Sequence, residues 1–194
     1  MALSIRVNAV VEESIVDGPG LRYVLFTQGC PHACKGCHNP ETHCASGGYT
    51  VEVRALLEQI KENPLLAGVT FSGGEPFLQP APLQELARAV KQLGKSIVVY
   101  SGFTFEQLLV KAETNIHIKK LLALCDLLID GPYIEELKDL ELQFKGSSNQ
   151  RVLNKQDREN LHAAFIARKQ AHKTSSDFEL EAFCLGHENL EQCA

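Results

Sequence analysis

The chain has 194 residues, of which 44% are hydrophobic and 22% charged, and its formal net charge is −5. This length suits one domain with its own core, and the acidic balance argues against a nucleic-acid-binding surface, which normally carries a basic patch. No apolar stretch is long enough to cross a bilayer, the N-terminus lacks a signal-peptide pattern, and the 7 cysteines are an odd number. We therefore expect a cytoplasmic protein whose cysteines bind metal or act in catalysis more often than they form disulfides.

Two apolar runs near the N-terminus predict strands over residues 5–11 and 21–27. Directly after the second run, Cys30, Cys34 and Cys37 follow one another at the spacing C-x3-C-x2-C. The thiols are therefore expected to lie in one loop at the end of a strand.

Three thiolates in one loop can hold three corners of a cubane iron–sulfur cluster and leave the fourth iron open to a small molecule. An ordinary electron-transfer cluster uses four cysteines. Zinc is the alternative, because it also binds clustered Cys and His. Structural zinc usually needs a second ligand pair further along the chain, and none follows here. The spacing therefore favours an open cluster, with zinc as the second interpretation.

The rest of the chain alternates between helical and strand patterns. We predict further strands over residues 69–71, 96–100, 126–129 and 150–153, and helices over 51–62, 83–93, 115–124 and 156–172. One more helix is predicted to start at a capping box of Thr104 with Gln107. Thr50 is the expected N-cap of the first helix and Gly94 the C-terminal cap of the second. In the last helix, Leu161, Ala164 and Phe165 are expected to face inward.

This alternation predicts an α/β fold with a parallel sheet. Five or six strands are too few for a closed eight-stranded barrel, so we expect a partial (β/α) barrel that is open on one side. Residues 1–172 are predicted to form this domain, and residues 173–194 a loosely ordered tail.

Four unusual loops are expected at the carboxyl ends of the strands, where functional groups gather in parallel sheets. They are the cysteine loop and residues 72–76, 100–103 and 130–133. In the second loop, Gly73 and Gly74 let the backbone approach a ligand closely. Carbonyl groups and the carboxylate of Glu75 there could receive an ammonium group.

The three cysteines, followed by Ser72-Gly73-Gly74-Glu75-Pro76, resemble the motifs of the radical S-adenosylmethionine (radical SAM) superfamily. The resemblance implies that Cys30, Cys34 and Cys37 bind a [4Fe–4S] cluster and that SAM chelates its fourth iron. It also implies that Gly73, Gly74 and Glu75 hold the SAM amino group, with Ser101 near the ribose and Asn149 and Arg151 near the adenine. Gly36 departs from the pattern, because the position before the third cysteine is often aromatic.

The segment Asp17-Gly18-Pro19-Gly20-Leu21-Arg22 resembles the hallmark of the enzymes that activate glycyl-radical enzymes. In that family Asp17, Gly18 and Arg22 would contact the glycine loop of the partner. Residues 100–103, 128–133 and 143–151 resemble the activating proteins of anaerobic (class III) ribonucleotide reductase more than those of pyruvate formate-lyase.

The resemblance implies an enzyme that receives an electron from flavodoxin or a similar donor, cleaves SAM and makes a glycyl radical on the large subunit of the reductase. Pyruvate formate-lyase is the alternative partner, and a small-molecule substrate or a non-enzymatic metal-binding module are further alternatives. No nucleic-acid or membrane partner is expected. Cys125 is predicted to be a core thiol, and no role is assigned to Cys44, Cys184 or Cys193.

Overall fold

A computed structural model describes residues 3–174 of the chain. Its strands are β1 (Ser4–Ser14), β2 (Arg22–Thr27), β3 (Tyr49–Glu52), β4 (Gly68–Gly73), β5 (Ser96–Tyr100), β6 (Leu127–Asp130) and β7 (Arg151–Leu153). Its α-helices are α1 (Val53–Glu62), α2 (Pro80–Gln92), α3 (Phe105–Thr114), α4 (Ile116–Leu124) and α5 (Lys155–Thr174). Three short 3₁₀ turns, η1 (Pro40–Thr42), η2 (Pro76–Leu78) and η3 (Glu135–Leu137), lie in the loops.

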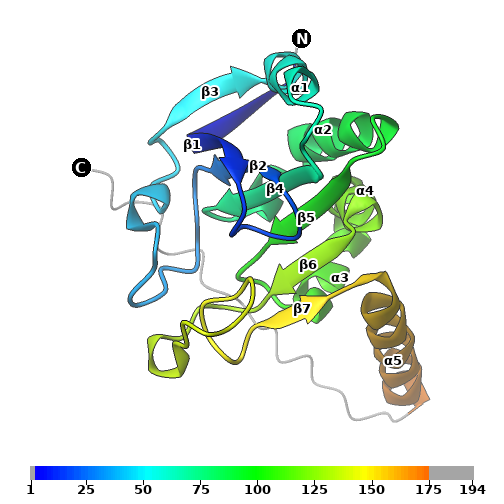
Figure 1. Ribbon diagram of the computed structural model, residues 1–194. Helices are drawn as coiled ribbons and strands as arrows, with labels where there is room; N and C mark the ends of the chain where they lie inside the picture. Colours follow the sequence, from blue (N-terminus) through cyan, green and yellow to red (C-terminus); the bar gives the residue numbers. More distant parts are fainter. Residues whose placement is uncertain (1–2, 175–194) are drawn as a thin grey trace.

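The strands form one seven-stranded sheet in the order β3-β1-β2-β4-β5-β6-β7 (Figure 1). Strands β2, β4, β5 and β6 are parallel, whereas β1 runs antiparallel to both of its neighbours and β7 antiparallel to β6. The predicted α/β class is confirmed. The predicted five or six strands miss β3, and the predicted parallel sheet is corrected to a mixed one, because β1, β3 and β7 run antiparallel to their neighbours.

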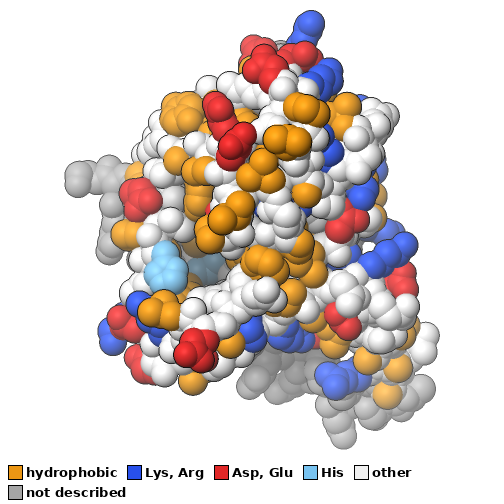
Figure 2. All heavy atoms as spheres, in the orientation of Figure 1, with side chains coloured by type: hydrophobic (Ala, Val, Ile, Leu, Met, Phe, Trp, Pro, Cys, Tyr) orange, Lys and Arg blue, Asp and Glu red, His pale blue; other side chains and the backbone are white. Residues whose placement is uncertain are grey.

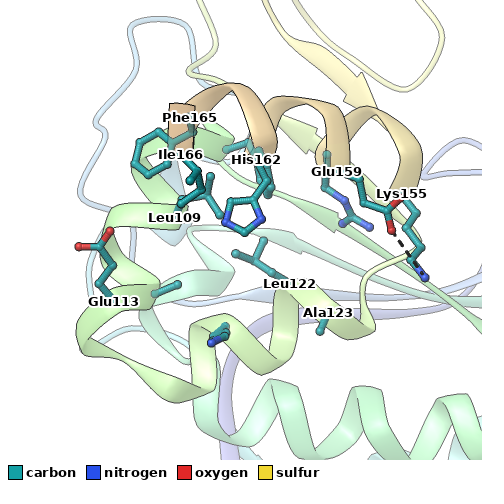
Figure 3. Close-up of a pocket in the computed structure, with 13 residues that line it drawn as sticks. Leu109, Glu113, Leu122, Ala123, Lys155, Glu159, His162, Phe165 and Ile166 are labelled. Atoms are coloured by element: carbon teal, nitrogen blue, oxygen red, sulfur yellow. Dashed lines mark ion pairs between the residues drawn. The ribbon is translucent and has the colours of Figure 1, made fainter. Parts of the chain in front are cut away.

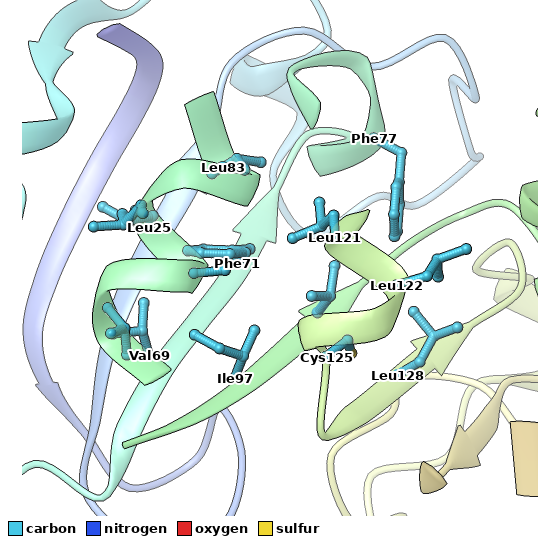
Figure 4. Close-up of a cluster of buried hydrophobic side chains, with 14 of the residues drawn as sticks. Leu25, Val69, Phe71, Phe77, Leu83, Ile97, Leu121, Leu122, Cys125 and Leu128 are labelled. Carbon is cyan, nitrogen blue, oxygen red and sulfur yellow. The ribbon is translucent and has the colours of Figure 1, made fainter. Parts of the chain in front are cut away.

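One face of the sheet carries the hydrophobic core. Alternate residues of each strand point to this face and meet the apolar stripes of α1, α2 and α4. The buried cluster includes Leu25, Val69, Phe71, Ile97 and Leu128 from the sheet, and Leu83 and Leu121 from the helices (Figure 4). Leu56, Ile60 and Leu86 from the helices belong to the same cluster. The helices fix the parallel strands, whose carboxyl ends then meet along one edge.

The opposite face of the sheet is covered by loops. Val24, Val98 and Ile129 point to this face and are buried, although they lie outside the main cluster. The turn before β2 packs on it, because a Cβ placed on Gly18 would lie 3.2 Å from Cγ2 of Val98. The sheet is therefore covered by helices on one face and by loops, including the turn before β2, on the other.

Local signals predicted several element boundaries. Gly94 has a φ of +73° after α2, and Thr104 and Gln107 form both hydrogen bonds of a capping box at α3. The N-cap prediction for Thr50 is wrong, because residues 49–52 pair with β1 and α1 begins only at Val53. That pairing joins residues more than forty positions apart, so no local signal marks it.

Helix α5 follows the prediction in extent but not in its inward side. Leu161 and Phe165 are half-buried, whereas Ala164 is exposed, so the inward prediction for Ala164 is wrong. Most of the predicted tail, residues 175–194, lies outside the described residues. Within the described part of the chain, no helix is long and apolar enough to span a membrane.

Candidate functional site

A cavity of about 460 Å³ opens where the central strands end. It is lined by the three motif cysteines, by residues that follow β4, β5 and β6, and by the loop over residues 139–146. Among the predicted site residues, those that line it are Asp17, Cys30, Cys34, Cys37, Gly73, Gly74 and Ser101. On the loop-covered face, shown in Figure 2, hydrophobic side chains gather around a hollow beside a histidine.

The cysteine loop is held by its own backbone. The Gly29 amide donates to the Thr42 carbonyl at 2.8 Å, and the Cys37 amide donates to the Cys34 carbonyl at 3.1 Å. Two residues in the loop are left-handed, Ala33 with a φ of +46° and Gly36 with a φ of +70°. The left-handed backbone at position 36 favours glycine, which accounts for the missing aromatic residue there.

Two of the motif thiols, those of Cys30 and Cys34, favour the protonated form when no metal is bound. Burial raises the pKa of Cys30 to about 12 and also raises the pKa of Cys34. A bound cation reverses this preference and displaces the protons, so metal binding and thiol ionisation are coupled here.

The described residues contain no group of three or more His, Cys, Asp or Glu side chains that could hold a single metal ion. A structural zinc ion would need such a tetrahedral group. A [4Fe–4S] cubane instead takes each thiolate on a different iron, and the three motif cysteines all line the same cavity. Three thiols on one cavity, with no fourth cysteine among the described residues that line it, match a cluster that leaves one iron open.

The carboxylate of Glu75 joins three loops. It is 0% exposed, and the amide of Phe77 and the amide of Gly102 each donate to it at 2.9 Å. The Ser101 hydroxyl lies 3.0 Å from both carboxylate oxygens, and Nε2 of His32 lies 2.9 Å from one of them. Because these partners occupy the carboxylate, Glu75 is not free in this structure to receive an ammonium group from the cavity.

His32 lies inside the cysteine motif and is the functional residue that the sequence did not single out. Its ring packs edge-on against Phe103, with ring centroids 4.4 Å apart. A Cβ on Gly102 would lie 2.3 Å from the same ring, so only glycine fits there. No sequence signal identifies this role, because His32 fills an unspecified position of the C-x3-C-x2-C spacing and its partner Glu75 is 43 residues away.

Gly73 and Gly74 are required by packing before any ligand is considered. A Cβ on Gly73 would lie 2.5 Å from the backbone of Phe26, and one on Gly74 would lie 2.3 Å from the carbonyl oxygen of Gly29. The Gly74 amide is used by Thr27, but its carbonyl accepts no hydrogen bond among the described residues. That carbonyl remains available to a donor in the cavity.

Arg22 does not lie on the surface, so the prediction that it contacts a partner is corrected. The side chain is 0% exposed and donates to the hydroxyl of Ser96 at 2.6 Å and to the carbonyl of Val69 at 2.6 Å. It also donates to Oγ1 of Thr70, whose hydroxyl donates in turn to the Asp17 carbonyl at 2.8 Å. Arg22 therefore supports the turn that carries Asp17, whereas Asp17 itself reaches the cavity.

Arg151 is likewise committed to structure. Its guanidinium pairs with Asp130 at the end of β6 and donates to both carboxylate oxygens of Glu106 on α3, at 3.1 and 2.8 Å. Neither Arg151 nor Asn149 lines the cavity, but Gln150 between them does. A direct contact of Arg151 with an adenine is therefore not supported by the structure.

Cys125 confirms the prediction of a core thiol. It is buried, and its sulfur donates to the carbonyl of Leu127 at 3.1 Å.

Comparison with known proteins adds independent information. Residues 16–153 match the family model described as a 4Fe-4S single cluster domain. The anaerobic ribonucleoside-triphosphate reductase-activating protein of Vibrio cholerae is 35% identical over 145 residues, which cover 70% of this chain and 89% of that protein. The protein of the same name from Escherichia coli K12 is 34% identical over 149 residues, covering 71% and 91%.

A third relative is similar over a shorter region. The pyruvate formate-lyase-activating enzyme of Clostridium pasteurianum is 39% identical over 94 residues, which cover 46% of this chain and 40% of that enzyme.

Proposed function

The chain belongs to the 4Fe-4S single cluster domain family and to the anaerobic ribonucleoside-triphosphate reductase-activating proteins within the radical SAM activases, and on this premise we propose that it makes a glycyl radical on such a reductase. The observation that carries the proposal is the shared cavity, which brings the three motif thiols together with the backbone of Gly73 and Gly74. The cofactors of this family are a [4Fe–4S] cluster and SAM. Together they supply the one-electron chemistry that removes a hydrogen atom from a glycine.

Cys30, Cys34 and Cys37 would hold the cluster through their thiolates. The carbonyl of Gly74 is the acceptor we assign to the SAM ammonium group, because it has no other hydrogen bond in the described structure. Glu75 would act indirectly, by positioning the loops around SAM. Its carboxylate connects the cysteine loop, through His32, to the loop after β5. Ser101 is held by the same carboxylate at the cavity wall, where a ribose would lie.

The cavity lies at one end of a sheet whose two edges do not meet. We interpret this sheet as part of a (β/α) barrel, and its open side would admit a protein loop. The turn at Asp17 and Gly18 borders that opening, and we assign it to contact with the glycine loop of the reductase. An electron donor such as flavodoxin would approach the same cluster in the reducing cytoplasm. The reductase is favoured over pyruvate formate-lyase as partner, because the match covers 89% of a reductase-activating protein and only 40% of a lyase-activating enzyme.

The test is an anaerobic incubation of the reconstituted protein with SAM, a reductant and each candidate partner. We expect about four irons per chain, formation of 5′-deoxyadenosine, and a glycyl-radical signal in electron paramagnetic resonance on the reductase. Cys34→Ala should abolish both products, whereas Cys125→Ala, a thiol in the core, should retain them. A Cys34→Ala protein that still cleaves SAM would overturn the ligand assignment, and a radical on pyruvate formate-lyase alone would overturn the choice of partner.

A further inference from the structure

A second cavity, of about 430 Å³, lies far from the cysteines, between α5 and the pair α3 and α4. Figure 3 shows its walls, with Leu109, Leu122, Phe165 and Ile166 directed toward one another from three helices. Phe105, Ala112 and Ala123 add further apolar surface to this groove. The family match ends at residue 153, so α5, which forms one wall, lies outside the matched region.

Arg158 adds a buried, positively charged group to this apolar groove. The residue is only 6% exposed and lines the groove from α5. Its Nη2 donates to the carbonyl of Cys125 at 2.5 Å, but its Nη1 is buried and has no hydrogen-bond partner in the described structure. A buried guanidinium nitrogen without an acceptor is costly, and a carboxylate is its preferred partner.

The other charged groups of the groove leave an excess of positive charge. Lys119 and Lys155 line it together with Arg158. Its two acids are each engaged by a lysine, Glu113 by Lys169 and Glu159 by Lys155. The groove therefore suits a segment that combines large apolar side chains with carboxylates.

The chain itself contains such a segment directly after α5. Residues 175–194 include five acidic residues and no Lys or Arg, and residues 178–183 read Phe-Glu-Leu-Glu-Ala-Phe. Thr174 lies sixteen helical positions beyond Arg158, about 24 Å along the axis. The seven residues from Thr174 to Glu181 span about the same distance when extended, so the segment is long enough to return along α5.

We propose that residues 177–185 dock in the groove between α3, α4 and α5, with Phe178 and Leu180 among its apolar side chains and the Glu181 carboxylate on Nη1 of Arg158. The docked segment completes the packing of α5, whose groove-facing side is otherwise only half-covered. This inference is independent of the proposed activity, because none of the described residues that line the groove also lines the cysteine cavity.

The chain has no tryptophan, so Phe165→Trp places a single fluorescent reporter on the groove wall of the full-length protein. We expect blue-shifted emission and weak quenching by acrylamide. Adding Phe178→Ser and Glu181→Gln should shift the emission to the red and raise the quenching constant at least about twofold, as the docked population falls. The matched control is Leu190→Ser with Glu191→Gln, which likewise replaces one apolar and one acidic residue but outside the proposed segment, and it should leave the reporter unchanged.

Three results would overturn the proposal. The first is a reporter that is equally quenched with and without the Phe178 and Glu181 changes. The second is an equal response to the control changes, which would indicate a general effect of the segment's composition. The third is protection that grows with protein concentration while the chain sediments as a dimer, because a second copy would then be the occupant. None of these readouts needs the cluster or SAM, so they leave the proposed function untouched.

Discussion

At the scale of single residues, Glu75 shows how a motif residue can hold the loops of a site together through its own hydrogen bonds. Its carboxylate is completely buried, and its hydrogen bonds reach the cysteine loop through His32 and the loop after β5 through Gly102. A buried carboxylate is tolerated only when donors satisfy it, and here every donor comes from a loop that lines the cavity. The residue therefore fixes the loops relative to one another.

Glu75→Gln should destabilise the protein by about 1–3 kcal/mol, because the new amide group would face the Gly102 amide or the Ser101 hydroxyl and leave a buried donor without a partner. Urea unfolding of the apoprotein measures this loss. If the loops are fixed as the structure shows, the variant should also bind less iron under anaerobic reconstitution.

Glu85→Gln is the matched control, since Glu85 lies on α2 and pairs only with Arg88 of the same helix. We expect its free energy of unfolding to change by less than about 0.5 kcal/mol. If both variants lost the same free energy of unfolding, the idea that Glu75 fixes the cavity loops would be contradicted.

At the scale of elements, Arg151 joins β7 to its surroundings. The short strand β7 pairs only with β6, and its arginine binds Asp130 of β6 and Glu106 of α3 at once. The hydrogen bond from Arg151 lowers the pKa of Glu106. The pair therefore stabilises the fold when Glu106 is ionised.

This linkage sets a direction for the pH dependence. A lowered pKa in the folded state gives stabilisation that is present above the pKa of the unfolded chain and is lost as the pH falls through the folded value. Because the pair is partly exposed, Glu106→Gln should cost about 0.5–1 kcal/mol at pH 7, and the difference from the unchanged protein should shrink below about pH 4. Urea titrations at both pH values measure it.

Glu58→Gln provides the comparison, because Glu58 pairs with Lys61 inside α1 and joins no second element. It should show little effect at either pH. A Glu106→Gln penalty that stays constant down to pH 3 would contradict the ion-pair interpretation.

The same elements show what the sequence could and could not predict. Boundaries set by local chemistry, such as the capping box at Thr104 and the glycine at position 94, were predictable because their partners lie within a few residues. Strand β3 was missed because its only partner, β1, is distant in sequence.

The site followed the same division. The cysteine spacing and the glycine loop identified the cavity, since both are local patterns at strand ends. The burial of Arg22 and the use of Glu75 by His32 depend on contacts that only the fold creates. A motif therefore predicted where the chemistry lies but not which side chains are already occupied.

At the scale of the whole molecule, exposed apolar residues border the cavity. Ile15 is 78% exposed, Val16 73% and Leu140 85%, and Val16 and Leu140 also line the cavity itself. Large apolar side chains that remain this exposed around a site are typical of a surface that another protein covers. Under the proposed function, that protein is the reductase.

The combined change of Ile15, Val16 and Leu140 to Ser should lower kcat/KM for radical formation on the reductase about tenfold or more, because buried apolar anchors dominate docking. SAM cleavage without the reductase, driven by a chemical reductant, should keep its rate, since none of the three side chains is assigned to the cofactors. The ratio of the two rates separates a docking defect from damage to the site.

Leu65 supplies the control, because it is 77% exposed and precedes β4, at the end of the strands away from the cavity. Leu65→Ser removes one comparably exposed apolar side chain from a surface that the reductase should not reach. Equal losses in the two proteins would mean that exposed apolar residues matter only for solubility. A triple variant that retains full kcat/KM would place the docking surface elsewhere, and the turn at Asp17 and Gly18 would then have to bind the glycine loop without an apolar border.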